Sequence, residues 1–286
     1  MLSVVVAPWV GDSKPVFVHN PDELHEAAST MKIAVLAALC RSGVSLDAEV
    51  PVVNRFESVV GGEFGNDPDR DSDPLPWELL GTHVPLRLLA ERMITHSSNL
   101  ATNICLARTT QRAVADVWRR AGATHSSTPR GIEDHAARAQ GVHNRVTARD
   151  LVRLLRSLAG EPELLGLLAC NEFRVDLAAG LPANTRIAFK NGWIPGTRLA
   201  VGVVQAADCP PYLIAVCYTG PLADGTDRTD PAARVIARIS KAVWDRRDQI
   251  SRAVLPARPA PARPAPARPA PPRPAPPRPA PLRPAG

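Results

Sequence analysis

Lysine, paired cysteines and long apolar runs are all scarce in this sequence. Of its 34 basic residues, only Lys14, Lys32, Lys190 and Lys241 are lysines. The five cysteines form no Cys-x-x-Cys pair, which favours reduced core thiols over a disulfide framework or a metal site. No run reaches the roughly 18 apolar residues that a membrane-spanning helix needs, so we expect no transmembrane segment.

The first residues are apolar but do not have the pattern of a signal peptide. Residues 1–8 lack a basic flank and a small-residue cleavage site, and polar residues follow at once. We interpret them as a first strand and expect a cytoplasmic protein if Met1 is the true start. An exported protein is the alternative if translation starts upstream of Met1.

The net charge of +6 comes from the carboxyl-terminal end of the chain. From Leu255 onward there are six arginines and no acidic residue, which leaves 28 basic residues against 28 acidic ones in the body. The body is therefore neutral, and its charge gives no support to nucleic-acid binding by the folded part.

Residues 253–286 repeat Arg-Pro-Ala-Pro-Ala or Arg-Pro-Ala-Pro-Pro, a composition that cannot bury a core. We expect a disordered tail of polyproline type. Such a tail either has no partner or contacts a polyanionic surface or a polyproline-binding protein.

Strand-like runs lie near both ends of the body, and helical patterns lie between them. We expect strands over 3–9, 15–19, 50–60, 186–190, 198–205 and 212–219, and helices over 29–41, 84–94, 99–107, 111–121, 147–158, 161–169 and 231–244. The fold class is therefore α+β: one antiparallel sheet built from amino- and carboxyl-terminal strands and flanked by helices, plus an all-helical region. We assign 1–252 to this domain, with its sheet region in 1–60 and 180–252 and its helical region in 61–179.

The most informative stretch is Ser29-x-x-Lys32, at the start of the apolar helix over 29–41. Residues three apart share one helix face, so the serine can be a nucleophile and the lysine the amine that takes its proton. The alternative is a serine that only caps the helix. A buried lysine can lose its proton whereas arginine cannot, and a chain that otherwise uses arginine has kept lysine here.

Two further short motifs follow in order, Ser97-Ser98-Asn99 and Lys190-Asn191-Gly192. With Ser29-x-x-Lys32 they resemble the motif set SxxK, SDN and KTG of the penicillin-recognising serine hydrolases, specifically the class A β-lactamase-like family. The resemblance covers residues 2–246 and implies the β-lactamase/transpeptidase-like fold. It implies no cofactor and no metal.

The resemblance also implies a role for each motif residue. Ser29 would attack a carbonyl carbon and form an acyl-enzyme, and Lys32 would activate it. Ser97 would relay a proton to the leaving nitrogen. The substrate would be bound by the remaining positions, Asn99, Lys190, Asn191, Gly192 and Trp193, with the backbone N–H groups of Ser29 and Trp193 forming the oxyanion hole.

Two positions depart from the family pattern. Asn191 replaces a Thr or Ser, so we expect its amide to keep a hydrogen bond to substrate with changed geometry. Ser98 replaces Asp, which we expect to matter less. Arg198 on the next strand is either a second anchor for a substrate carboxylate or a solvated arginine at the sheet edge.

The carboxylate that would activate water for deacylation has no clear counterpart. The family's Glu-x-x-Leu-Asn signature is missing from the loop over 130–138. Glu133 is the best candidate and Asp134 the second; the alternative is a loop acid paired with Arg130 or Arg138. We interpret His135 and His143 as loop residues, because no metal-ligand spacing occurs there.

Three functions remain open. The first is hydrolysis of the β-lactam amide, a small-molecule reaction of antibiotic catabolism and resistance. The second keeps the nucleophile but acts as an esterase, or as a D-amino-acid peptidase or penicillin-binding protein with poor deacylation; the missing loop signature favours it. The third is a non-catalytic binding module of the same fold, with the tail docking a partner.

Overall fold

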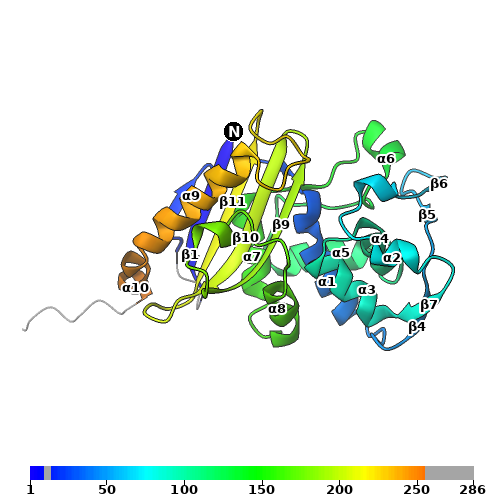
Figure 1. The fold of residues 1–286 in the computed structure, drawn as a ribbon, viewed down its shortest axis with the longest axis horizontal. Helices are drawn as coiled ribbons and strands as arrows, with labels where there is room; N and C mark the ends of the chain where they lie inside the picture. Colours follow the sequence, from blue (N-terminus) through cyan, green and yellow to red (C-terminus); the bar gives the residue numbers. More distant parts are fainter. Residues whose placement is uncertain (10–13, 255–286) are drawn as a thin grey trace, which may run out of the picture. The chain divides into compact units, whose positions relative to one another are not determined.

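A five-stranded antiparallel sheet joins the two ends of the folded chain in the computed structural model, which describes residues 1–9 and 14–254. The strands lie in the order β2-β1-β11-β10-β9, and β1 pairs with β11 along its whole length. They are β1 (Leu2–Pro8), β2 (Phe17–His19), β9 (Arg186–Ile194), β10 (Thr197–Gln205) and β11 (Tyr212–Thr219) (Figure 1). The predicted α+β fold, with a sheet from distant segments, is confirmed.

The remaining elements are mostly helical; all of them lie between β2 and β9 except α9 and α10, which follow β11. The α-helices are α1 (Lys32–Arg41), α2 (Leu75–Glu78), α3 (Leu86–Thr95), α4 (Asn99–Ala107), α5 (Gln111–Arg120), α6 (His135–Ala139), α7 (Ala148–Ser157), α8 (Pro162–Ala169), α9 (Pro231–Asp245) and α10 (Asp248–Val254). The 3-10 turns are η1 (Ala28–Met31), η2 (Pro68–Arg70) and η3 (Ala178–Gly180). Short strand pairs are β3 (His25–Glu26) with β8 (Arg145–Val146), β4 (Glu49–Pro51) with β7 (His83–Pro85), and β5 (Phe56–Glu57) with β6 (Glu63–Phe64).

Both faces of the sheet are covered by helices, because successive side chains of a strand point to opposite faces. Val5 and Ala215 belong to the large core that contains α1. Val4 and Val216 belong to a second core with Ile236 of α9. Figure 1 shows α9 along one face of the sheet, with α7 and α8 on the other side. The sheet is therefore the middle layer of its region.

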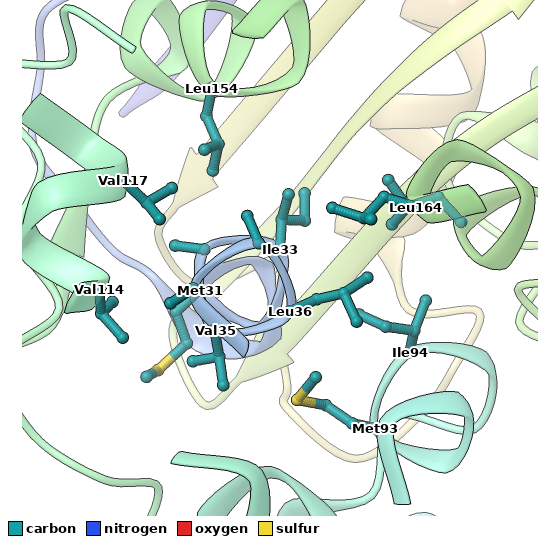
Figure 2. Packing of buried hydrophobic residues seen from close by; sticks show 14 of the residues in the cluster. Met31, Ile33, Val35, Leu36, Met93, Ile94, Val114, Val117, Leu154 and Leu164 are labelled. Carbon is teal, nitrogen blue, oxygen red and sulfur yellow. The ribbon is translucent and has the colours of Figure 1, made fainter. Parts of the chain in front are cut away.

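Helix α1 lies at the centre of the larger core. It is apolar nearly all round, as the sequence predicts, and its residues from Lys32 to Leu39 are buried. Figure 2 shows it surrounded by Val114 and Val117 of α5, Leu154 of α7 and Met93 of α3. The turn η1 that precedes α1 is therefore anchored on a rigid support.

Several helix starts follow the predicted capping residues. Ser98 Oγ accepts from Ala101 N at 3.1 Å, and Thr147 Oγ1 accepts from Asp150 N at 3.1 Å. Asp230 caps α9, where a proline occupies the first turn. These caps satisfy backbone N–H groups that a helix cannot satisfy itself.

The structure differs from prediction over 50–60. In place of one strand, β4 ends at Pro51 and β5 consists of Phe56 and Glu57 alone. Between them the Asn54 side chain bonds the backbone of Asn66, accepting from its N–H at 2.7 Å and donating to its carbonyl at 3.0 Å. This cross-link folds the segment into a loop instead of an extended strand.

The predicted tail over 253–286 lies outside the described residues, apart from the end of α10. Within residues 1–9 and 14–254, no helix is both long enough and apolar enough to cross a membrane.

Candidate active site

Ser29 and Lys32 lie one above the other at the start of the central helix. Ser29 is in η1, and a 3-10 turn has three residues per turn, so residues three apart are eclipsed. Ser29 is half-buried, whereas Lys32 is fully buried. The alternative of a capping serine is wrong: Ala27 is the N-cap of η1, Met31 that of α1, and neither start has a side-chain cap hydrogen bond.

Three acceptors hold the amine of Lys32. Its Nζ donates to the Ser97 carbonyl oxygen at 2.5 Å, to Ser97 Oγ at 3.2 Å and to Asn99 Oδ1 at 3.0 Å. Burial lowers the pKa of Lys32 from 10.5 to about 8, and the negative charges of Asp71 and Glu133 oppose this fall. An amine with a pKa this near to neutrality can accept and release a proton during catalysis.

The Ser97-Ser98-Asn99 motif forms a tight turn and the first residue of α4. Ser97 has a φ of 58°, in the left-handed region that non-glycine residues rarely adopt. Asn99 uses both ends of its amide: Oδ1 accepts from Lys32, and Nδ2 donates to Glu133 Oε1 at 2.9 Å. Asn99 therefore links the lysine of the first motif to the carboxylate of the loop.

Glu133 reaches the site although its loop lacks the family signature. Its Oε1 accepts from Asn99, and its Oε2 accepts from Asp67 N at 2.8 Å. The residue before it is fixed by Asn103, whose Oδ1 accepts from Ile132 N at 2.9 Å and whose Nδ2 donates to the Ile132 carbonyl at 2.8 Å. These contacts place Glu133 next to Asn99 and within electrostatic reach of Lys32.

The alternative that Glu133 is paired with Arg130 or Arg138 is wrong. Arg130 is buried and donates to the carbonyl oxygens of Gly131 and Val142. Among the ion pairs of the described residues, none involves Glu133.

The other candidates of this loop have structural positions. Asp134, the second candidate, is buried and caps α6, and its carboxylate also accepts from Ser58 Oγ at 2.9 Å. His135 is exposed at the start of α6. The His143 ring lies 3.0 Å from the carboxylate of Glu26. Of these loop acids, Glu133 alone bonds a motif residue.

Strand β9 is an edge strand of the sheet and brings the third motif to η1. Lys190 is fully buried, and its Nζ donates to the Asn191 carbonyl at 3.0 Å. Burial, and then the charge of Lys32, lower the pKa of Lys190 well below its usual value. Gly192 lies against Ser29, since a Cβ at position 192 would stand 2.5 Å from Ser29 N. A side chain at this position would therefore displace the nucleophile.

The side chain of Asn191 does not offer the free amide that the sequence predicts. It is fully buried, and its Nδ2 donates to the Phe173 carbonyl and to Asp176 Oδ2, each at 3.1 Å. Its Oδ1 accepts from Asn171 Nδ2 at 3.3 Å. Both amide N–H groups are used inside the protein, so Asn191 holds β9 in place instead of presenting a donor to substrate.

Arg198 is neither a solvated edge arginine nor a free carboxylate anchor. Its side chain is fully buried, with Nε 2.6 Å from Asp176 Oδ1 and Nη1 3.3 Å from Asp230 Oδ2. Its Nη groups also donate to the carbonyls of Asp227 and Arg228. The guanidinium is occupied on all sides, which makes Arg198 the centre of a buried ion cluster. No local sequence pattern indicates its two carboxylate partners, which lie 22 and 32 positions away.

An aromatic pair lies next to this cluster. Trp193 contacts Phe173 edge to face at 5.6 Å, and the guanidinium of Arg228 stacks on Phe173 at 4.5 Å from its centre. Arg228 is exposed and forms no ion pair within the described residues. Arg228 therefore contacts the aromatic neighbour of Trp193, a position that the sequence did not indicate.

Backbone strain gathers around these residues. Of the five non-glycine residues with positive φ in the described chain, four are Ala28 (43°), Ser97 (58°), Glu133 (65°) and Asp176 (55°), and the fifth is Asn20 in an exposed turn. Such conformations cost of the order of 1 kcal/mol or more each and tend to persist where function requires them. Ala28 directly precedes the predicted nucleophile, and Ser97 and Glu133 are themselves the predicted proton relay and base.

Two more site residues were missed from the sequence, Asp71 and Asn103. Asn103 lies four residues after Asn99 and so on the same face of α4, a spacing that could have revealed it. Asp71 lies in a loop rich in Asp and Pro, where no local pattern distinguishes it. In the described part of the chain, no group of three His, Cys, Asp or Glu side chains could hold a metal ion.

A family profile described as the beta-lactamase enzyme family matches residues 3–247. The chain belongs to this family. The resemblance to the penicillin-recognising serine hydrolases is thereby confirmed over nearly the whole body. No curated protein sequence matches the chain significantly.

Solved structures of beta-lactamase family members share the fold. A beta-lactamase from Xanthomonas campestris superposes with a TM-score of 0.71 at 18% identity, over 87% of this chain and 92% of the other. The reconstructed class A beta-lactamase of the last common ancestor of Gram-negative bacteria gives 0.69 at 23% identity, over 86% and 93%. The structure of PBP-A gives 0.68 at 20% identity, over 86% and 90%. At these identities the likeness concerns the fold.

Proposed function

We propose that this protein is a serine hydrolase that forms an acyl-enzyme and acts best on the amide of a β-lactam. The observation that carries the proposal is the environment of Lys32. A buried amine with a pKa of about 8 bonds Ser97 Oγ and Asn99 Oδ1, one 3-10 turn from Ser29. A structural lysine in a core would be expected to pair with a carboxylate, whereas here the direct partners are the residues of the second motif.

Acylation would proceed by attack of Ser29 Oγ on the carbonyl carbon of the substrate. The serine proton passes to the neutral amine of Lys32, and the oxyanion is stabilised by the backbone N–H groups of Ser29 and Trp193. When the carbon–nitrogen bond breaks, the Ser97 hydroxyl gives its proton to the leaving nitrogen. Lys32 then returns a proton to Ser97 through the hydrogen bond between Nζ and Oγ.

Deacylation would use Glu133 to activate a water molecule. Its carboxylate is joined to Lys32 through Asn99, so the water would lie between the acyl-serine and the glutamate. Each oxygen of Glu133 accepts one hydrogen bond from the protein, and a carboxylate oxygen has a second lone pair for water. The Asn103 contacts to Ile132 hold the loop while this occurs.

The second candidate is a D-amino-acid peptidase, an esterase or a penicillin-binding protein whose acyl-enzyme decays slowly. It is favoured by the absence of the Glu-x-x-Leu-Asn signature and by the hydrogen bond from Asp67 N, which competes for the charge of Glu133. Acylation of Ser29 proceeds in the same way for both candidates. They differ only in what happens to the ester of Ser29.

A single set of reactions separates these candidates. A chromogenic cephalosporin reports turnover and a fluorescent penicillin reports a stable acyl-enzyme, with Ser29→Ala and Glu133→Gln as variants. The control is Glu57→Gln, which changes an exposed acid of β5. Turnover lost in both site variants but kept in the control supports a β-lactamase. A stable label on Ser29 without turnover supports the second candidate, and no label at all refutes catalysis by this serine.

A further inference from the structure

The middle residue of the second motif lacks the carboxylate that the family carries there. Ser98 caps α4 with its hydroxyl, which accepts from Ala101 N. The N–H groups of Asn99 and Leu100 lie in the first turn of α4, where a helix offers no acceptor of its own. In this buried setting, both groups require a partner from elsewhere in the chain.

Asp71 supplies that partner from a loop 27 to 29 positions earlier in the sequence. Its Oδ1 accepts from Asn99 N at 3.0 Å, and its Oδ2 accepts from Leu100 N at 2.9 Å and from Ser98 Oγ at 3.1 Å. Trp77 Nε1 donates to the same carboxylate at 3.0 Å. A negative charge here also meets the positive end of the α4 dipole, which is favourable.

The backbone that Asp71 fixes carries the acceptors of Lys32. The carbonyl of Ser97 and the side chain of Asn99 both bond Nζ, and Ser97, with its left-handed φ, directly precedes the residues that Asp71 bonds. Asp71 is also the first of the negative charges that oppose the effect of burial on the Lys32 pKa. It therefore affects Lys32 through position and through charge.

We infer that Asp71 is a positioning residue that replaces the missing carboxylate of the Ser97-Ser98-Asn99 motif and keeps Ser97 and Asn99 in place around Lys32. The kinetic part of this inference rests on the proposed function. The structural part does not require catalysis, since it concerns the start of α4.

A double-mutant cycle tests the replacement directly. The variants are Asp71→Ala, Ser98→Asp and the combination of both, with Asp69→Ala as control because Asp69 is an exposed acid of the same loop. Two quantities are measured for each: the melting temperature, and the rate of acylation by a fluorescent penicillin as a function of pH.

We expect Asp71→Ala to lower the melting temperature by about 5 °C, the effect of losing a helix cap in a domain of this size. Acylation should slow by roughly 10- to 100-fold at its plateau, because the reacting groups are displaced. Its pH inflection should move below that of the wild type, since a charge that favours protonated Lys32 is gone. Asp69→Ala should behave as the wild type.

Ser98→Asp alone should also lower the melting temperature, because it places a second carboxylate beside Asp71 at the same N–H groups. The combined variant should recover the melting temperature and bring acylation back to within about threefold of the wild type. Ser98→Asp is thus expected to be destabilising alone but stabilising in the Asp71→Ala background. Such a reversal is expected only if the two carboxylates can replace each other at the same N–H groups.

Additive effects in the cycle would overturn the inference. So would a fall in melting temperature without any change in the pH profile of acylation, which would leave Asp71 a purely structural cap. If no probe acylates the wild type, the proposed function fails. The melting temperature still tests the structural part: its recovery in the combined variant supports the replacement, and a failure to recover refutes it.

Discussion

Gly192 of β9 lies directly against the backbone of Ser29: a Cβ at position 192 would stand 2.5 Å from Ser29 N and 3.2 Å from Ser29 Cα. Cβ atoms in proteins essentially never lie within 3.0 Å of such an atom, so the contact with Ser29 N excludes a side chain in this arrangement. The contact joins the third motif to the first and sets the nucleophile, and the N–H group proposed for the oxyanion hole, against the edge of the sheet. Neither motif could move without displacing the other.

Gly192→Ala should therefore impair acylation more than stability. The new methyl group has to push η1 away from β9, which misplaces Ser29, and we expect the acylation rate to fall by about 100-fold. The measurement is the labelling rate with a fluorescent penicillin. Gly166→Ala on α8 is the control, because no atom lies within 4 Å of a Cβ there. A Gly192→Ala variant that labels at the wild-type rate would contradict the contact.

The pH dependence of acylation follows from Lys32. Its pKa of about 8 means that the neutral amine, the form that accepts the serine proton, becomes scarcer as the pH falls below 8. We expect the rate to drop roughly tenfold per pH unit below pH 7 and to level off above pH 9. Stopped-flow labelling between pH 5.5 and about 10 would measure this profile.

Lys32→Arg serves as the matched variant for this profile. A guanidinium keeps the positive charge but cannot give up its proton, so acylation should be lost at every pH. A flat profile in the wild type, or substantial activity in Lys32→Arg, would mean that Lys32 does not act as the base.

The buried ion cluster of Arg198 should govern stability. Arg198→Met leaves the carboxylates of Asp176 and Asp230 in the interior without their cation. Removing one partner of a buried ion pair typically lowers the free energy of unfolding by about 3–5 kcal/mol. Urea unfolding measures the loss. Arg186→Met, at an exposed position at the start of β9, is the control and should change stability by less than about 0.5 kcal/mol. Equal stability of the two variants would contradict a central role for Arg198.

The sequence allowed the fold class and the three motifs to be predicted, because both depend on local patterns. The apolar runs of β10 and β11, capping at Ser98 and Thr147, and the retention of lysine at 32 and 190 are visible without coordinates. That strands from both ends of the chain share one antiparallel sheet followed from their positions, whereas the order of the strands was not predicted. These predictions needed only neighbours in the sequence.

The errors concern partners that are distant in the sequence. Arg198 pairs with carboxylates 22 and 32 positions away, and Asn191 bonds the Phe173 carbonyl 18 positions before it. Asp71 reaches Asn99 across 28 positions. No periodicity or spacing marks such contacts, because they arise only when the loops pack against the strand and the helix. What a polar side chain bonds in the fold decides its role, and the residue type alone does not.

The second lysine of the site should take up a proton when an anionic ligand binds. Burial and the nearby charge of Lys32 lower the pKa of Lys190 well below its usual value, which disfavours its charged form in the free protein. A substrate carboxylate close to Lys190 favours the charged form, so its pKa rises on binding and a proton is taken from solution. Calorimetry of penicillin binding to Ser29→Ala, in buffers of different ionisation enthalpy, measures the number of protons taken up.

We expect uptake of up to about one proton at neutral pH, and tighter binding as the pH falls, since protons and anion then bind together. Lys190→Met in the same background should abolish the uptake and weaken binding. The control is Lys241→Met, which removes a lysine paired with Asp245 on the exposed face of α9 and should change neither quantity. If proton uptake persists in Lys190→Met, another group takes up the proton. Lys32, whose charge acts on Lys190, would be the first group to test. Binding without any uptake would mean that Lys190 is already charged in the free protein and that its burial is compensated by the protein itself.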